Sequence, residues 1–190
     1  MEYKEYMKAI KNVSEILQQQ NVQMAEVLEI LKTVRNEERQ VFICGNGGSA
    51  GTATHFAADL FKMAKIKAIS LDDNVPLMTA LINDEGWGEL YIQQLGVLFN
   101  PGDILIALSV HGGSGEDQAG AWSQNLNKAI SYVKDNGGCA IGFTGFDGGT
   151  MKENCNICIN VPSDSTPVVE SLHTVIHHFI AFALHEGDRR

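Results

Sequence analysis

A glycine-rich turn between a buried strand and a helix constrains this chain more than any other stretch. Residues 41–44 form a short apolar, β-prone run, typical of a strand that is covered on both faces. The turn that follows contains Gly45, Asn46, Gly47, Gly48 and Ser49, which tolerate positive φ and leave backbone N–H groups uncovered. A helix is expected over residues 49–63, with Ser49 as its N-cap. Because unpaired N–H groups and the helix dipole point to one place, the turn predicts an anion-binding site.

Apolar strand-like runs alternate with helical segments along the chain. Further strands are expected at 68–71, 104–108, 139–143 and 156–161, and further helices at 75–82, 89–98, 118–135 and 167–185. Strands that are apolar on both faces and separated by helices predict an α/β fold, a doubly wound, flavodoxin-like parallel sheet of about five strands. The length predicts a single domain over residues 1–190. Two amphipathic helices, over 2–20 and 22–37, are expected to use their apolar faces for packing or oligomerisation.

Charge and composition exclude several classes of protein. The net charge is −9 and the basic residues do not cluster, which disfavours a nucleic-acid binder. The sequence has no apolar run of membrane-span length and no signal peptide at its start, so we expect a cytoplasmic protein without a membrane partner. Cys155 and Cys158 lie in an alternating, strand-like stretch, which favours buried free thiols over a metal or redox site.

Three turns rich in Gly, Ser or Asn follow three of the expected strands, after residues 44, 108 and 143. In a parallel sheet, ligands bind at the carboxyl ends of the strands, and these ends share one edge. The three turns are therefore expected to meet and to form one binding site.

Two motifs resemble a known family. The stretch from Cys44 to Ser49, followed by His55 to Leu60, is similar to the sugar isomerase (SIS) fold and, within it, to the phosphoheptose isomerases. The resemblance implies a phosphate loop after residue 108, with Ser109 as its first serine and His111 where a second is expected. Ser114 and Ser123 are alternatives for its last serine, and the stretch 115–122 between them is expected to act as a lid or specificity element. The resemblance also assigns four residues to the sugar pocket, Asn83, Asp84, Thr144 and Asp147.

Histidine and carboxylate side chains on two helices suggest a metal site. His55 and Asp59 are four residues apart and share a helix face. The last helix carries Glu170, His173, His177 and His178 beside an expected apolar stripe of Leu172, Ile176, Phe179 and Ala183. Helical phase places Glu170 nearer to His177, whereas the register of the resemblance pairs it with His178. The resemblance implies one Zn²⁺ or similar divalent ion held by His55, Asp59, Glu170 and His178, with Asp59 and His178 as the acid–base pair.

The resulting expectation is a metal-assisted phosphosugar isomerase. By resemblance the substrate is sedoheptulose 7-phosphate, converted through an enediol to D-glycero-D-manno-heptose 7-phosphate by a homo-oligomer, most simply a tetramer. Two alternatives stay open, a non-catalytic SIS scaffold similar to a partner of the bacterial replication initiator and a phosphosugar-sensing module. The residues do not separate an isomerase from an epimerase.

Overall fold

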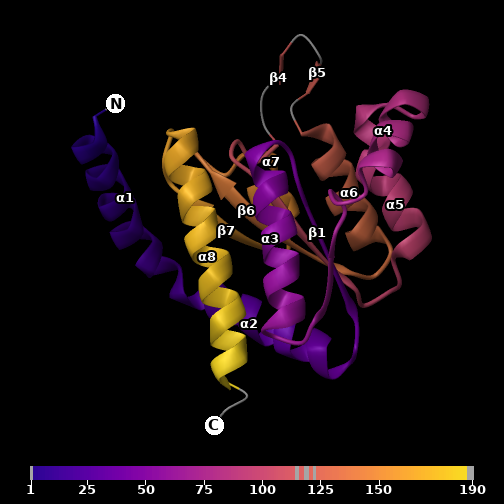
Figure 1. Ribbon diagram of the computed structural model, residues 1–190, viewed down its shortest axis with the longest axis horizontal. Coiled ribbons are helices and arrows are strands. Elements are labelled where there is room, and N and C mark those ends of the chain that lie inside the picture. Colours follow the sequence, from indigo (N-terminus) through magenta and orange to yellow (C-terminus); the bar gives the residue numbers. More distant parts are fainter. Residues whose placement is uncertain (1, 114–115, 118–119, 122, 188–190) are drawn as a thin grey trace.

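The computed structural model describes residues 2–113, 116–117, 120–121 and 123–187. Its centre is a five-stranded, all-parallel sheet in the order β2-β1-β3-β6-β7 (Figure 1). The strands are β1 (Gln40–Gly45), β2 (Lys67–Ser70), β3 (Ile104–Ser109), β6 (Cys139–Gly145) and β7 (Ile157–Val161). This is the predicted doubly wound sheet, and the strand order reverses between β1 and β3, where such sheets bind ligands.

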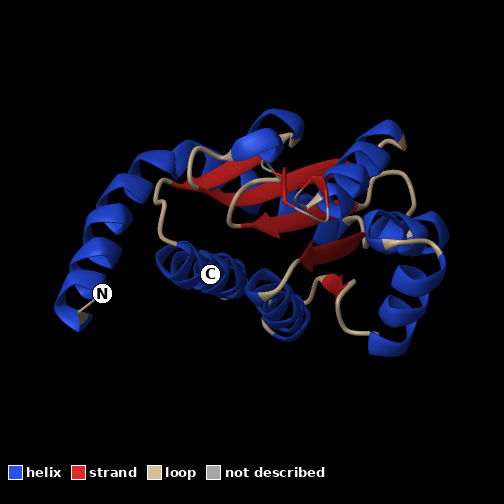
Figure 2. Cartoon of the chain, turned by 90° about the horizontal axis from the view of Figure 1, so that it is seen from above, coloured by secondary structure: helices blue, strands red, loops and turns tan. Residues whose placement is uncertain are grey.

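Helices cover both faces of the sheet, as the view from above shows (Figure 2). One apolar core joins the sheet to α2 (Asn21–Asn36), α3 (Gly48–Lys62) and α8 (Thr166–Gly187). The second core, on the opposite face, joins it to α5 (Leu90–Leu98), α6 (Gln124–Asp135) and α7 (Gly149–Asn154). The remaining helices are α1 (Tyr3–Leu17), η1 (Gln18–Gln20), α4 (Val75–Asp84) and η2 (Trp87–Glu89). The central strands β1, β3 and β6 are buried on both faces, whereas buried and exposed residues alternate along the edge strand β2.

Two expected helix starts differ from the structure. The N-cap of α3 is Gly47 rather than Ser49, and its φ of 61° lies in the left-handed region that favours glycine. The helix expected from residue 118 begins at Gln124, because Ser123 has a left-handed φ of 53° and interrupts the helical backbone. Upstream of Ser123, β4 (Glu116–Asp117) and β5 (Gly120–Ala121) pair as a short antiparallel ribbon.

Helix α8 is rotated by about one residue from the orientation expected from its sequence. Its buried residues include Leu172, Ile176 and Ile180, whereas Phe179, part of the expected stripe, is 51% exposed. By length and composition α8 could cross a membrane, but half of its most apolar window is buried in the fold. One face of α8 thus serves the core, and the rotation brings His177 into the interior.

Candidate active site

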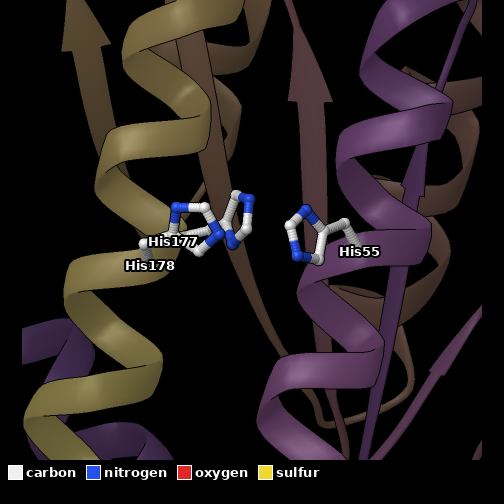
Figure 3. Close-up of side chains that lie close together, drawn as sticks. All are labelled: His55, His177 and His178. Atoms are coloured by element: carbon white, nitrogen blue, oxygen red, sulfur yellow. The ribbon is translucent and has the colours of Figure 1, made fainter.

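Three imidazoles meet between α3 and α8 (Figure 3), and the carboxylate of Asp59 lies within 3.7 Å of each of them. The Oδ2 atom of Asp59 lies 3.6 Å from His55 Nε2, 3.7 Å from His177 Nδ1 and 3.7 Å from His178 Nε2. The centroids of the three rings are 4.3–4.9 Å apart. We call His55, Asp59, His177 and His178 the histidine cluster.

The packing of the two helices explains this arrangement. His55 and Asp59 are one turn apart on α3, so both face α8. Consecutive residues of a helix point about 100° apart. His177 therefore enters the core, where its ring packs 5.3 Å from the Phe56 ring, while the side chain of His178 stays 43% exposed.

The innermost atoms of the cluster lack ordinary partners. Asp59 Oδ2 and both ring nitrogens of His177 are buried without a hydrogen bond to any described residue. Burial, with His178 and His55 nearby, lowers the pKa of His177 to about 3, so its ring is neutral and can offer a lone pair. Unpaired buried polar groups are costly, and a divalent cation could ligate both the imidazole and the carboxylate.

The spacing of the donor atoms fits such an ion. Zinc holds nitrogen and oxygen ligands at about 2.0–2.2 Å, which places the ligand atoms of a tetrahedral site about 3.3–3.6 Å apart. The three separations from Asp59 Oδ2 lie within a few tenths of an ångström of this range. The ligand nitrogens of the three imidazoles lie within 4.8 Å of one another, so the rings would move closer together by up to about 1 Å to complete the coordination.

Glu170, a ligand in the expected set, is not part of the cluster. A Cβ atom placed on Gly48 would lie 2.3 Å from Glu170 Oε1, so this carboxylate rests against the first turn of α3. Seven residues, or about 10.5 Å of helix rise, separate Glu170 from His177. His177, which the sequence left as an alternative to His178, lies with its Nδ1 3.7 Å from Asp59 Oδ2. The place of Glu170 in the ligand set stays a prediction.

His173 has a structural role and lies outside the histidine cluster. It is buried, its Nε2 donates to the Thr144 carbonyl at 3.0 Å, and burial lowers its pKa to about 4. The Thr144 hydroxyl is buried too and donates to Asn160 Oδ1 at 2.9 Å. Both side chains therefore tie α8, β6 and β7 together rather than lining an open pocket.

The three glycine- and serine-rich turns meet at one edge of the sheet, as expected. The Gly145 N–H donates to the Val110 carbonyl at 3.0 Å, which joins the turns after β3 and β6. Asn46, in the turn after β1, exchanges two side-chain hydrogen bonds with Asn125 at the start of α6, at 3.0 and 2.9 Å. Ser123 Oγ lies 3.5 Å from both Ser109 Oγ and Asn46 Nδ2, so these polar groups form one cluster.

The other expected pocket residues have varied positions. Ser49 is buried within the first turn of α3, and the His111 ring packs on Phe146 with centroids 4.5 Å apart. Asp147 is exposed and accepts from the Gly149 N–H. Asn83 and Asp84 do not form a loop; they end α4, are exposed, and bond to each other at 2.7 Å. Ser114 lies outside the described residues, as do positions 115, 118–119 and 122 of the expected lid.

Three polar residues at this edge were missed from the sequence, namely Asp72, Tyr91 and Asn125. Asp72 follows the second strand directly, at the same edge as the turns, and this position could have identified it. Tyr91 lies in an apolar helix, where a buried hydroxyl needs a partner. Asn125 stands beside Ser123, at a helix start where polar side chains often bond to loops.

Comparison with known proteins assigns the chain to a family. The profile of the SIS domain matches residues 2–145, so the chain belongs to the SIS domain family. Within this family it belongs with the phosphoheptose isomerases, as its motifs suggested. It is 35% identical to the phosphoheptose isomerase of Rhodospirillum rubrum over 162 residues, covering 83% of this chain and 81% of that protein. It is also 35% identical to the Helicobacter pylori strain P12 enzyme over 184 residues, covering 94% and 90%.

Other relatives extend the comparison. The chain is 39% identical over 150 residues to the lincomycin biosynthesis protein LmbN of Streptomyces lincolnensis, covering 74% of this chain and 54% of that longer protein. The structure of a Neisseria gonorrhoeae phosphoheptose isomerase superposes with a TM-score of 0.80 at 27% identity, covering 97% and 95% of the two chains. One from Francisella tularensis gives 0.86 at 24% identity, covering 96% of each chain, and supports the fold. The expectation of a member of an isomerase family is confirmed.

Proposed function

We propose that this chain interconverts the aldose and ketose forms of a phosphorylated sugar, with a divalent ion such as Zn²⁺ in the histidine cluster. The substrate that we propose is sedoheptulose 7-phosphate, converted to D-glycero-D-manno-heptose 7-phosphate, in line with the names of the relatives. The observation that carries the proposal is the buried Asp59 Oδ2 atom with three imidazole nitrogens within 3.7 Å. A non-catalytic scaffold would not need this buried set of donors.

Burial assigns different roles to the residues that would hold the ion, His55, Asp59, His177 and His178. The side chain of His177 has no exposed surface, so it can serve as a ligand but cannot touch the sugar. The His178 side chain is 43% exposed and can reach a substrate. Because a catalytic metal site keeps one position for substrate, His178 is the ligand that would give up its place.

The reaction moves one proton between neighbouring carbons and another between their oxygens. Asp59 is the base that takes the carbon-bound proton and returns it to the adjacent carbon, and His178 moves the proton between the two oxygens. When bound, the metal ion supplies Lewis-acid stabilisation of the negative charge on those oxygens. The phosphate is assigned to the Ser109 and Ser123 hydroxyls and the neighbouring turns, since a phosphate monoester accepts several hydrogen bonds at once.

Metal analysis of protein purified without added metal tests this proposal. The wild-type chain should contain about one divalent ion per subunit. His177→Ala should lower metal affinity at least tenfold, since even residues that only support a ligand contribute 10–100-fold. His185→Ala is the matched control, because His185 lies on the same helix but binds the Met63 carbonyl instead. A protein that contains no metal and isomerises the sugar in the presence of a chelator would contradict the metal role.

We also infer that the chain forms a homo-oligomer, most simply the expected tetramer. Figure 1 shows α1 reaching away from the body next to α8. An apolar groove of about 300 Å³ lies between α8 and the segment from the end of α1 to α2, lined by Leu17, Met24, Val175 and Phe179 among others. Val175, Phe179 and Phe182 are 45–58% exposed on α8, and exposed apolar patches of this kind mark interaction surfaces. A second copy of the chain, carrying the same apolar helices, is the partner that we propose.

Sedimentation measurements test the oligomer. The wild-type chain should sediment as an oligomer at micromolar concentration, and Phe179→Ser should shift it toward monomer. Exposed Phe61, at the end of α3 and away from this groove, supplies the control variant Phe61→Ser. A wild-type chain that stays monomeric would overturn the inference.

A further inference from the structure

A buried tyrosine hydroxyl beside the β1–α3 turn has no role in the chemistry proposed above. Tyr91, on α5, is fully buried. Its Oη lies 2.6 Å from the Gly45 carbonyl oxygen, 2.8 Å from Asp72 Oδ1 and 3.1 Å from Asn46 Oδ1. The second oxygen of Asp72, Oδ2, accepts the Gly45 N–H at 3.0 Å. Asp72 and Tyr91 thus hold both backbone polar groups of Gly45, and we call these residues, with Asn46 and Asn125, the turn network.

The amide orientations in this network follow from one backbone contact. The Leu126 N–H donates to Asn125 Oδ1 at 2.9 Å, which fixes the Asn125 amide. Asn125 Oδ1 then accepts from Asn46 Nδ2, and Asn125 Nδ2 donates to Asn46 Oδ1. Asn46 therefore presents its oxygen, not its nitrogen, to Tyr91. The three polar neighbours of the Tyr91 hydroxyl are all oxygen atoms.

The short contacts of the Tyr91 hydroxyl outnumber the protons that it can donate. The Tyr91 hydroxyl has a single proton to donate, yet it makes short contacts with both the Gly45 carbonyl and Asp72. A short buried contact between two oxygens needs a proton between them. The carbonyl carries none, so a separate hydrogen bond in each contact requires a proton on Asp72, which this carboxyl holds below its pKa. Above that pKa, the two acceptors share the Tyr91 proton. Protonated Asp72 donates to Tyr91, and Tyr91 donates to the Gly45 carbonyl.

The surroundings of Asp72 raise its pKa and so favour its protonated form. Burial raises the pKa of Asp72 from its usual 3.8 to about 6, and nearby Asp73 acts in the same direction. The hydrogen bonds from Tyr91, Gly45 and Ser70 act against it. Cys44 is the other titratable group beside the pair, and its own pKa is raised by burial, so it is a neutral thiol.

We propose that Asp72 and Tyr91 are positioning residues for phosphosugar binding, linked by the proton on Asp72 and fixing the β1–α3 turn against the start of α6. The choice of a phosphosugar as the ligand rests on the proposed function. The fixed turn keeps Asn46 Nδ2 near Ser123 Oγ, and Ser123 Oγ is in turn 3.5 Å from Ser109 Oγ. A phosphate group is bound by several donors at once. Greater mobility of Asn46 therefore weakens phosphosugar binding, even though no donor is removed.

Kinetics of three variants, measured below pH 6 where Asp72 holds its proton, test the proposal. Tyr91→Phe should raise the KM for sedoheptulose 7-phosphate about tenfold and change kcat by less than about threefold, because the hydroxyl positions the site and does not touch the reacting atoms. Asp72→Ala should behave like Tyr91→Phe. Asp72→Asn should recover most of the loss, since its amide can donate to Tyr91 and accept from Gly45 as the protonated acid does.

Tyr132→Phe is the matched control, because Tyr132 lies on α6 and packs on Phe99 away from the turn. It should leave KM unchanged. An unchanged KM in Tyr91→Phe would overturn the positioning role. If Asp72→Asn raised KM as much as Asp72→Ala, the protonated link would be wrong.

A second measurement needs no substrate and separates this proposal from the proposed function. The carboxyl ¹³C resonance of Asp72 should titrate with a midpoint near pH 6, and the Gly45 and Asn46 amide resonances should move with the same midpoint. In Asp72→Asn these amide resonances should not show that midpoint. An Asp72 midpoint near the ordinary value of about 4 would overturn the proposal even if the chain isomerises the sugar. The expected titration in a chain that is inactive on sedoheptulose 7-phosphate would sustain the positioning network and contradict only the proposed substrate.

Discussion

The histidine cluster and the turn network differ in how their buried polar atoms are satisfied. In the turn network, each buried oxygen near Gly45 has a donor within the chain, provided that Asp72 holds a proton. In the histidine cluster, Asp59 Oδ2 faces imidazole nitrogens and is buried without a hydrogen bond. Burial has opposite effects on protonation in these two places. It raises the pKa of Asp72 to about 6, so this carboxyl keeps its proton below that pH. It lowers the pKa of His177 to about 3, so that the lone pair of the neutral ring is available to a cation.

The largest effect should come from the centre of the histidine cluster. Asp59→Asn keeps the size of the side chain but removes the carboxylate that the proposed function uses as base and ligand. The kcat for sedoheptulose 7-phosphate should fall 10²–10⁴-fold, the usual contribution of a positioned acid or base. Asp135→Asn, an exposed change at the end of α6, is the control. If Asp59→Asn kept full activity and circular dichroism showed a native fold, the cluster would not be the reaction centre.

A smaller effect should appear at His173, one turn before His177 on α8. His173 has one hydrogen bond, to the Thr144 carbonyl, and burial lowers its pKa to about 4 from 6.5. A lowered pKa means that the unfolded chain binds the proton more tightly. Stability is therefore complete at neutral pH and falls as the pH drops from about 6.5 toward 4, by about 3 kcal/mol in total.

His173→Leu removes this titration. The free energy of unfolding, measured with urea at pH 7 and pH 4, should fall less between the two pH values in the variant than in the wild type. The difference between the two chains should approach the same 3 kcal/mol. His185→Leu, at a partly exposed position on α8, controls for the general loss of a histidine. Equal acid sensitivity in the His173→Leu variant and the wild type would mean that His173 titrates normally.

The sequence predicted those features that depend on local pattern. The sheet followed from apolar strand runs, and the meeting of the three turns followed from the common direction of parallel strands. His55 and Asp59 were paired correctly on one face because a spacing of four residues is a property of any helix. These features need no knowledge of how distant segments pack.

Features that depend on long-range packing were missed. The rotation of α8 decides whether His177 or His178 enters the interior. Phe179 was expected in the buried apolar stripe of this helix but is half exposed. The contact of Tyr91 with Gly45 joins residues 46 positions apart, so local pattern could not reveal it. Asp72 follows the strand expected at 68–71, but only the packing shows that its carboxylate holds the turn at Gly45.

The smallest effect should come from a substitution of Glu170. This substitution also tests whether Glu170 belongs to the histidine cluster. The Glu170 carboxylate lies at the N-terminus of α3, where a negative charge interacts favourably with the helix dipole by 0.3–1 kcal/mol. Glu170→Gln should therefore lower the free energy of unfolding by that amount at low ionic strength and by less at high salt, where the interaction is screened. Its metal content should equal that of the wild type, because the proposed ligand set contains His177, which lies beside Asp59, and not Glu170. Loss of metal from Glu170→Gln, with metal retained in His177→Ala, would restore the ligand set expected from the sequence and remove His177 from the cluster's function.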